Sequence, residues 1–404
     1  MQQYDFLPII IGTDINAYNM AISFHEEYGI NPIIIGKEEM SFTKLSSIPG
    51  AIEINNNLWD RDKFVEVLKE TALKYEAPER KMLLIGTNDF YVRLIIENMD
   101  ILQKWYVFNY PSEELLNKLL LKKNFYQLCN EYGLDTPTTY FYSCKEKEKF
   151  DETINFPVIV KPSNGVQYYK NKFAGQQKVY KVNSNDELQK IIDQINNSGY
   201  EDDLIIQDYI PGDDTYMWDS VFYLNTKGKA QLGTVAQVVL QEHTVTAIGN
   251  YTAVITRYNE ELLEKLQQFL ESIGYQGFAN FDIKYDERDG KYKVFEVNIR
   301  QGRSSYYTTA CGHNMAAYFV DDIIYGKQKQ LSWLKTDYLF TVVPKIVLKK
   351  FVKDKGINRE VRRLIKEKKW GNPLFYSQDR SWKRKIYLAL RQINYYRKYK
   401  NNMW

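Results

Sequence analysis

Residues 280–298 read Asn-Phe-Asp-Ile-Lys-Tyr-Asp-Glu-Arg-Asp-Gly-Lys-Tyr-Lys-Val-Phe-Glu-Val-Asn. Two segments in which apolar and polar residues alternate, 280–285 and 292–298, flank a polar connection that ends in Gly290. Alternation with a period of two is typical of strands with one buried face, and a short connection containing Gly joins adjacent antiparallel strands. The sequence therefore predicts a β-hairpin.

The pairing of these two strands brings polar side chains together. A ladder centred on Asp289 pairs Asn280 with Asn298, Phe281 with Val297, Asp282 with Glu296 and Ile283 with Phe295. Directly opposite residues share a face, so Asp282, Glu296 and Asn298 lie together, away from the apolar pairs. Facing carboxylates repel unless a cation lies between them, and oxygen ligands suit Mg²⁺, which also binds substrate phosphates. A solvated acidic face is the alternative, which we disfavour because only Lys284 is available to neutralise it.

Two cationic side chains follow the hairpin directly, in the segment Arg300-Gln301-Gly302-Arg303-Ser304-Ser305. Guanidinium groups bind the paired oxygens of phosphate and carboxylate groups. We therefore expect Arg300 and Arg303 to bind anionic oxygens beside the metal.

Two earlier apolar runs also end in polar motifs. Residues 155–162 carry Lys161 at the end of a buried-type strand, and the turn Ser163-Asn164-Gly165 follows. A cation at the end of such a strand needs a partner, and a turn of this kind can approach a phosphate. Residues 204–214 form a second apolar strand that leads into the carboxylates of Asp213 and Asp214. Each motif alone is also compatible with an ordinary strand and turn.

The first third of the chain reads as a parallel α/β unit. Apolar runs end at residues 11, 36 and 86, and continuous runs of this kind are typical of strands covered on both faces. Gly-Thr-Asp (12–14) and Gly-Thr-Asn-Asp (86–89) then lie at the carboxyl edge of the sheet, where ligands bind in open α/β folds, or serve only as turns and caps. A fourth strand is expected at 105–110. A helix opens at Pro111-Ser112, with Lys122 near its middle.

Composition and charge exclude several classes of protein. The 404 residues exceed one typical domain, and 44% apolar with 26% charged residues excludes a disordered chain. No run of 18 apolar residues and no signal-peptide pattern occurs, so we expect a cytoplasmic protein. The net charge of +3 conceals an asymmetry: residues 345–404 hold 19 Lys and Arg against 4 Asp and Glu, or +15, and residues 1–344 carry −12.

The basic end contains two cationic stretches with apolar stripes, 361–370 and 382–397. The interpretation we favour is a helical appendage that packs by its stripe on the acidic body. The alternative is attraction to an anionic surface, such as the inner leaflet of a membrane. No nucleic-acid partner is expected.

Taken together, the order and spacing of these motifs resemble the ATP-grasp superfamily over roughly residues 112–325. The resemblance implies an ATP-grasp fold, α/β with an α+β C-terminal part, preceded by a Rossmann-like domain. It implies that Lys122 and Lys161 hold the α- and β-phosphates of ATP, that Gln207, Asp208, Tyr209 and Ile210 line the adenine site, that Asp214 binds the ribose, and that Asp282, Glu296 and Asn298 hold two Mg²⁺ ions. Residues 163–169 lack the Gly-rich lid of many relatives, so the residue that contacts the γ-phosphate is unassigned.

More narrowly, residues 8–21, Ile248-Gly-Asn-Tyr251, 277–286 and 298–305 resemble the D-aspartate ligases of low-GC Gram-positive bacteria. The resemblance implies that ATP activates the β-carboxylate of D-aspartate as an acyl phosphate, which joins the lysine ε-amine of a peptidoglycan precursor peptide. Lys161, Arg300 and Arg303 are then the expected catalytic residues, with Arg300 on the phosphoryl group and Arg303 on the second donor carboxylate, or the reverse. A ligase for another amino acid or amine, or a non-catalytic nucleotide-binding scaffold, is the alternative.

The same resemblance divides the chain into four segments. We predict an N-terminal Rossmann-like domain over 1–111, a central ATP-grasp subdomain over 112–203, a C-terminal subdomain with the metal site over 204–330, and a basic helical region over 331–404.

Overall fold

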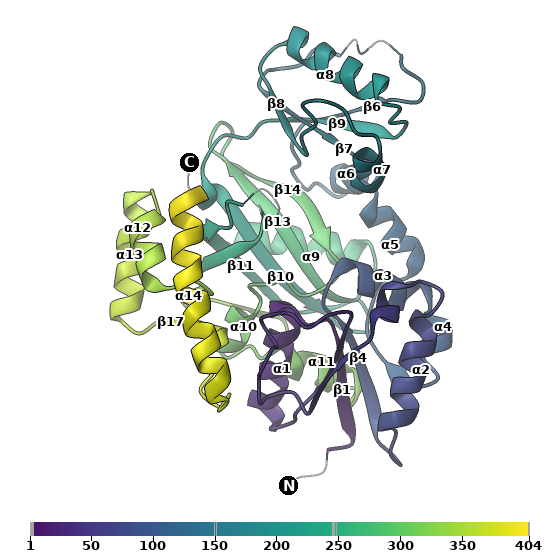
Figure 1. Cartoon of the computed structure of the whole chain (residues 1–404), viewed down its shortest axis with the longest axis vertical. Helices are drawn as coiled ribbons and strands as arrows, with labels where there is room; N and C mark the ends of the chain where they lie inside the picture. Colours follow the sequence, from purple (N-terminus) through teal and green to yellow (C-terminus); the bar gives the residue numbers. More distant parts are fainter. Residues whose placement is uncertain (1–3, 149, 151, 245–246, 248, 403–404) are drawn as a thin grey trace.

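The computed structural model describes residues 4–148, 150, 152–244, 247 and 249–402. It contains three β-sheets (Figure 1). In Figure 1 the small sheet lies at the top, the largest in the centre and the N-terminal sheet below, with the C-terminal helices along the left side. Ile248, which belongs to one of the motifs above, lies outside the described residues.

The N-terminal sheet is parallel, as predicted, with the strand order β3-β2-β1-β4-β5. Its elements are β1 (Phe6–Ile11), α1 (Ile15–Tyr28), β2 (Ile33–Gly36), β3 (Ala51–Ile54), α2 (Phe64–Tyr75), β4 (Lys81–Gly86), α3 (Asp89–Glu97), α4 (Met99–Leu102) and β5 (Tyr106–Val107). Ile10 packs into one hydrophobic cluster, while Ile9 and Ile11 pack into another. Both faces of β1 are therefore covered, which explains its continuous apolar run.

Two helices, α5 (Glu113–Leu120) and α6 (Lys122–Glu131), connect this sheet to the rest of the molecule. The prediction of one helix with Lys122 near its middle is wrong, because Leu121 has an extended backbone and divides the two helices. Lys122 is consequently the first residue of α6, and its ammonium reaches the hairpin formed by β13 and β14, described below.

The small sheet is antiparallel and has the order β6-β9-β7-β8. It consists of β6 (Thr139–Ser143), β7 (Val158–Pro162), β8 (Tyr180–Val182) and β9 (Asp203–Asp208), with the helices α7 (Gly165–Lys170) and α8 (Asn185–Asn197). Because β9 pairs with β6 and β7, the chain leaves this sheet after Asp208 and not at residue 203, where the sequence placed a division. The four-segment division itself stays a prediction.

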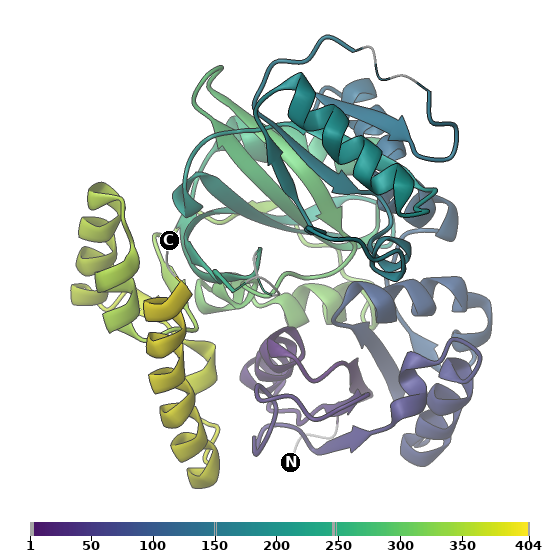
Figure 2. The ribbon, with the colours of Figure 1, turned by 45° about the horizontal axis from the view of Figure 1, so that its top comes forward.

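The largest sheet runs in the order β14-β13-β10-β11-β12-β16-β17, with β15 beside β11. Its strands are β10 (Met217–Leu224), β11 (Ala230–Gln241), β12 (Tyr251–Arg257), β13 (Gly277–Asp286), β14 (Lys291–Asn298), β15 (Ser332–Trp333), β16 (Leu339–Thr341) and β17 (Trp370–Gly371), and the helices α9 (Glu260–Ser272), α10 (Tyr306–Ala310) and α11 (Met315–Ile323) accompany it. Figure 2 shows this sheet between the other two.

The hairpin β13–β14 confirms three of the four predicted pairs. Asn280 lies opposite Asn298, Phe281 opposite Val297, and Asp282 opposite Glu296. The fourth pair is wrong, because Phe295 is an extra residue in a β-bulge and Ile283 therefore lies opposite Val294. The bulge explains why Val294 and Val297, three positions apart, both pack in the same core cluster.

The C-terminal region folds against the largest sheet. It adds β16 and β17 to the sheet edge, so it is not purely helical, and it then forms α12 (Lys345–Phe351), α13 (Lys355–Lys366) and α14 (Trp382–Asn402). Buried apolar side chains of all three helices join a cluster shared with the body, namely Val347, Leu348, Val361, Leu364, Leu388, Tyr395 and Tyr399. Among the described residues, no helix is both long and apolar enough to cross a membrane.

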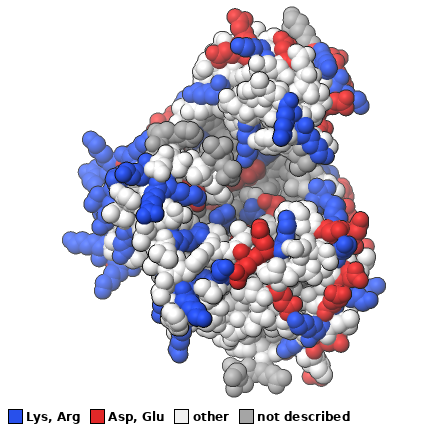
Figure 3. Space-filling view, viewed as in Figure 1, with Lys and Arg blue, Asp and Glu red and all other residues white. Residues whose placement is uncertain are grey.

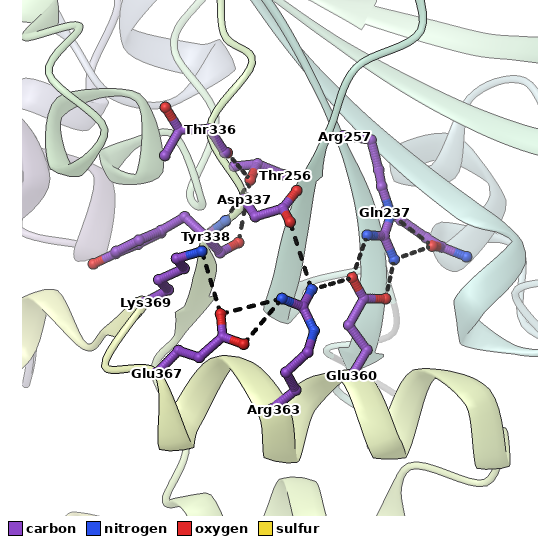
Figure 4. Close-up of polar contacts among 10 residues, drawn as sticks. All are labelled: Gln237, Thr256, Arg257, Thr336, Asp337, Tyr338, Glu360, Arg363, Glu367 and Lys369. Carbon is purple, nitrogen blue, oxygen red and sulfur yellow. Dashed lines mark hydrogen bonds and ion pairs between the residues drawn. The ribbon is translucent and has the colours of Figure 1, made fainter.

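An ion pair fixes α13 to the sheet. The guanidinium of Arg257 on β12 donates to both carboxylate oxygens of Glu360, over 2.8 and 2.7 Å (Figure 4). Gln237 also accepts from Arg257, over 2.9 and 3.1 Å. The cation here belongs to the acidic body and the carboxylate to the basic region, so the overall charge asymmetry does not describe this contact.

Candidate active site

Three carboxylates lie in register across neighbouring strands of the largest sheet. Asp219 on β10 lies opposite Asp282 on β13, which lies opposite Glu296 on β14. Tyr251 donates its hydroxyl proton to Asp282 over 2.9 Å, and the Asn298 amide lies 3.4 Å from the same carboxylate. The structure thus brings together all three predicted metal ligands.

Sequence reasoning missed Asp219, because a single Asp in an apolar strand carries no motif. Its carboxylate accepts hydrogen bonds from Asn280 and Ser304 and is 1% exposed. Burial raises its pKa to about 6. Asp219 can be assigned to the site only from the pairing of β10 with β13, which the tertiary structure shows and the sequence does not.

The electrostatics of the carboxylate pair depend on a lysine. Burial and the facing charge of Glu296 raise the pKa of Asp282 well above its usual range. Burial also works against the charge of Glu296, but Lys122, together with Asp282 and Lys161, outweighs burial and lowers the pKa of Glu296 to about 2. The Lys122 Nζ lies 2.5 Å from Glu296 Oε2. Two ionised carboxylates here require added positive charge, which is the environment that a divalent cation fits.

The side chains that could hold Mg²⁺ are two carboxylates and one amide. Over the described part of the chain, His, Cys, Asp and Glu side chains form no group of three or more suited to a metal ion. The remaining ligands of a Mg²⁺ at Asp282, Glu296 and Asn298 would come from phosphate oxygens and water. Mg²⁺ commonly binds in this way to phosphate-containing substrates.

A chain of hydrogen bonds connects the two predicted phosphate lysines. Lys161 Nζ donates to the side-chain oxygen Oε1 of Gln207 over 3.4 Å, and Gln207 Nε2 donates to the Tyr126 hydroxyl over 2.9 Å. The Tyr126 hydroxyl and Lys122 both donate to the carbonyl of Phe295, over 3.1 and 3.0 Å. The β-bulge exposes this carbonyl to both donors. Lys122, Lys161, Gln207 and the hairpin therefore form one connected site.

The two lysines lie in different electrostatic environments. Burial and the neighbouring charge of Lys122 lower the pKa of Lys161 to about 8. Burial opposes the charge of Lys122 as well, but Glu296, together with Tyr126 and Asp282, outweighs burial and raises the pKa of Lys122. Lys161 thus lacks a full counter-charge, so an anionic ligand at its ammonium would be stabilised.

The predicted adenine segment spans the end of β9 and the two residues after it. Tyr209 donates its backbone N–H to Pro157, and the Lys181 ammonium lies 3.8 Å from the centre of the Tyr209 ring. The Ile210 carbonyl accepts from Lys284 over 2.8 Å. The Asp208 carboxylate pairs with Arg288 over 2.6 Å, so its side chain faces the turn of the hairpin.

The predicted ribose ligand lies in a separate neighbourhood. Asp214 accepts hydrogen bonds from the backbone and side chain of Gln241, over 3.0 and 2.8 Å, and from His243 over 2.8 Å. The structure does not connect this carboxylate to the lysine network by any hydrogen bond between described residues. Sequence reasoning assigned no position to His243, and this contact gives it one.

Arg300 connects the hairpin to the N-terminal sheet. Its guanidinium pairs with Asp89 over 2.8 Å and donates to Asn298 over 3.1 Å. The segment around it is attached to α1, because Asn16 donates to the Gln301 carbonyl over 2.7 Å and Asn19 donates to the Arg303 carbonyl over 2.9 Å. The Gly-Thr-Asn-Asp turn at 86–89 therefore belongs to the site.

Arg303 differs from Arg300 in having no such partner. Within the described residues, its guanidinium makes no hydrogen bond or ion pair, and it lies 5.8 Å from the centre of the Phe42 ring. Asp14, at the N-cap of α1, is close enough that the charges of Arg303 and Arg300 oppose the burial that raises its pKa. Arg303 thus has a guanidinium without a hydrogen-bonding partner among the described residues, next to the partly buried Asp14.

A cavity of about 220 Å³ borders the site, lined by Asp89, Lys122, Glu296 and Asn298, among others. Two larger cavities lie elsewhere. One of about 550 Å³ lies beside the C-terminal region and includes Tyr306, Trp370 and Tyr376 in its lining, and one of about 640 Å³ lies beside β6. We place the chemistry at the smaller cavity, because it alone of the three contains the connected lysine and carboxylate side chains.

Comparison with known proteins identifies the family. The chain is 32% identical over 415 residues to the D-aspartate ligase of Enterococcus faecium (strain Aus0004), and the match covers 99% of this chain and 97% of that enzyme. This chain belongs to the D-aspartate ligase family. It is an ATP-dependent carboxylate-amine ligase with the ATP-grasp fold that the sequence motifs predicted. No protein-family model matches the chain.

Solved structures support the fold of this D-aspartate ligase family member. N5-carboxyaminoimidazole ribonucleotide synthetase in its ADP complex is 14% identical with a TM-score of 0.60, covering 89% of this chain and 85% of that chain. The L-amino acid ligase of Bacillus licheniformis is also 14% identical, with a TM-score of 0.55, covering 80% and 75% of the two chains. At this identity the likeness concerns the fold alone.

Proposed function

We propose that this ligase joins the β-carboxylate of D-aspartate to the lysine ε-amine of a peptidoglycan precursor peptide in the cytoplasm. The observation that carries the proposal is the convergence of Lys122, Asp282 and Glu296 in one site, within a chain that aligns along its length with a D-aspartate ligase. Two carboxylates and two lysines suit a nucleotide with metal-bound phosphates.

The reaction proceeds through two bond exchanges. A donor carboxylate oxygen attacks the γ-phosphorus of ATP, the bond to ADP breaks, and an acyl phosphate forms. The amine nitrogen then attacks the acyl carbon and loses a proton, and phosphate leaves, so that an amide remains. Catalysis in such a site consists chiefly of positioning and electrostatic stabilisation.

The lysines, the hairpin and the segment from the end of β9 onward bind different parts of the nucleotide. Lys161, whose ammonium lacks a full counter-charge, binds a phosphate oxygen together with Lys122. Asp282, Glu296 and Asn298 hold two Mg²⁺ ions, which neutralise charge on the phosphates when bound. Gln207 through Ile210 lie along the adenine, and Asp214 binds the ribose hydroxyls.

The two arginines take different parts in the reaction. Arg300 is held by Asp89 and Asn298 beside the carboxylate pair, and it stabilises the transferring phosphoryl group. The Arg303 guanidinium, which no described residue engages by a hydrogen bond or ion pair, binds the second carboxylate of the donor. A second carboxylate on the donor accounts for one guanidinium group in addition to the one beside the phosphoryl group.

The experiment that tests this function is phosphate release from ATP across a panel of D- and L-amino acids, with and without a lysine-containing precursor peptide. We expect release that requires D-aspartate and is strongly increased by the peptide, with an amide product visible by mass spectrometry. Equal release with L-aspartate, or release that requires a monocarboxylic amino acid, would contradict the assigned donor. Replacement of the peptide by its lysine-free analogue is the control for the acceptor.

A further inference from the structure

Helix α14 carries apolar side chains on two opposite faces. One face, with Leu388, Tyr395 and Tyr399, is buried against the body. The Tyr399 hydroxyl lies 2.7 Å from both the Gln241 carbonyl and the Thr252 hydroxyl. The helix is therefore held firmly and cannot turn its other face inward.

The opposite face of α14 exposes a stripe of large apolar side chains. The stripe consists of Trp382 (66% exposed), Ile386 (55%), Leu390 (63%) and Ile393 (54%). Spacings of four, four and three residues keep these four side chains on one side of a helix. An exposed contiguous apolar surface of this kind marks an interaction site.

Cations flank the stripe. Lys383, Lys385, Arg397 and Lys400 on the same helix are exposed, and within the described residues none of the four makes an ion pair. Lys and Arg also gather over the neighbouring helices α12 and α13, with few acidic side chains between them (Figure 3). Residues 345–404 together carry a net charge of +15.

We propose that α14 docks on an anionic lipid bilayer, with the stripe Trp382–Ile386–Leu390–Ile393 inserted among the headgroups and the flanking cations on anionic lipids. A helix lying in the interface needs an apolar face for the acyl boundary and Lys or Arg for the headgroups, and α14 presents both. Its anchored inner face fixes the orientation of the body on the surface. This proposal goes beyond the ligase function and does not depend on the donor.

Charge and the apolar stripe favour an anionic bilayer over two other partners, a second copy of the chain and a nucleic acid. A second copy of the chain would bring another strongly basic helical region against the stripe, and like charges repel. A nucleic acid would use the cations alone, because contacts to phosphates do not require the apolar stripe.

The test is sedimentation of the full-length protein with vesicles of phosphatidylcholine alone or mixed with phosphatidylglycerol. We expect at least about tenfold stronger binding to the anionic vesicles at low salt, largely lost in about 0.5 M NaCl. Equal binding to the two kinds of vesicle, or binding to neither, would overturn the proposal.

Variants separate the stripe from charge alone. Ile386→Ser/Leu390→Ser should bind anionic vesicles at least about tenfold more weakly, while phosphate release in solution stays unchanged. The matched control is Leu73→Ser/Ile101→Ser, which removes two exposed apolar residues from the N-terminal domain and should bind like wild type. If the stripe variant binds like wild type, or differs only in oligomeric state, the proposal is wrong.

Discussion

The ammonium of Lys122 lies 2.5 Å from a carboxylate oxygen of Glu296, and this contact joins the start of α6 to the hairpin β13–β14. The same ammonium donates to the carbonyl of Phe295, which a β-bulge makes accessible. Lys122 thereby supplies the positive charge that keeps Glu296 ionised beside Asp282. An anionic ligand that engages Lys122 would weaken this contact, and a cation at the carboxylates would replace it.

Nucleotide affinity should depend on pH through Lys161. Because its pKa is about 8, Lys161 is cationic below that pH and neutral above it. We expect the affinity for ATP, measured by calorimetry at saturating Mg²⁺, to fall as the pH rises from 7 to 9.5. The Lys161→Arg variant, which stays charged, should show a much flatter profile, and Lys161→Ala should bind at least about tenfold more weakly at pH 7.

The contribution of Lys161 to the stability of the fold changes with pH in the opposite direction to its contribution to ATP affinity. A folded pKa below the unfolded value means that the unfolded chain binds more protons between about pH 8 and 10.5. The contribution of Lys161 to the free energy of unfolding therefore rises with pH across that window. An unchanged ATP affinity in Lys161→Ala would remove Lys161 from the nucleotide site.

The free energy of unfolding should depend on pH through Asp219. Its pKa of about 6 lies above the unfolded value, so protonation stabilises the folded protein as the pH falls through 6. In urea unfolding, lowering the pH from 7 to 5 should raise the stability of wild type relative to Asp219→Asn by about 1 kcal/mol. A difference that does not change with pH would show that this carboxylate titrates normally.

Arg300 and Arg303 should affect different kinetic constants. Loss of the unengaged guanidinium in Arg303→Ala should raise the KM for the amino-acid donor about tenfold to a hundredfold, with little change in kcat. Arg300→Ala should instead lower kcat, because it removes the contacts to Asp89 and Asn298 beside the reacting phosphate. The reverse pattern in steady-state kinetics would exchange the two roles.

The Arg257–Glu360 pair should stabilise the docking of the C-terminal region. Its two parallel hydrogen bonds are partly buried, so a double-mutant cycle by urea unfolding should give a coupling energy of about 1 kcal/mol. The exposed pair Lys265–Glu261 is the matched control and should give about 0.3–0.5 kcal/mol. Equal coupling in the two pairs would mean that the geometry of the first adds nothing.

Local patterns in the sequence were sufficient for much of the fold. The apolar run of β1 has both faces covered, as expected from its composition, and Asp14 of the Gly-Thr-Asp turn caps a helix. The pairing of Asp282 with Glu296 followed from the spacing of one hairpin, because a period of two and a turn fix the register. These features depend on residues close in sequence.

The remaining features depend on contacts distant in sequence. The Phe295 carbonyl, at the bulge, meets donors on α6, and Asp219 joins the site only because β10 pairs with β13. The break at Leu121 likewise brings Lys122 to the hairpin. For α14, the sequence contained both apolar faces, but only the packing shows that Leu388 lies inside and Leu390 outside.

The most direct test of this account is the rate of ADP formation by Glu296→Gln with ATP, Mg²⁺, D-aspartate and the precursor peptide. We predict a loss of more than about a hundredfold with an intact fold, since the variant removes both a proposed metal ligand and the partner of Lys122. Glu264→Gln, which changes an exposed carboxylate on α9, is the control and should react like wild type. Turnover by Glu296→Gln within about tenfold of wild type would contradict the assignment of the hairpin as the centre of the ligase chemistry.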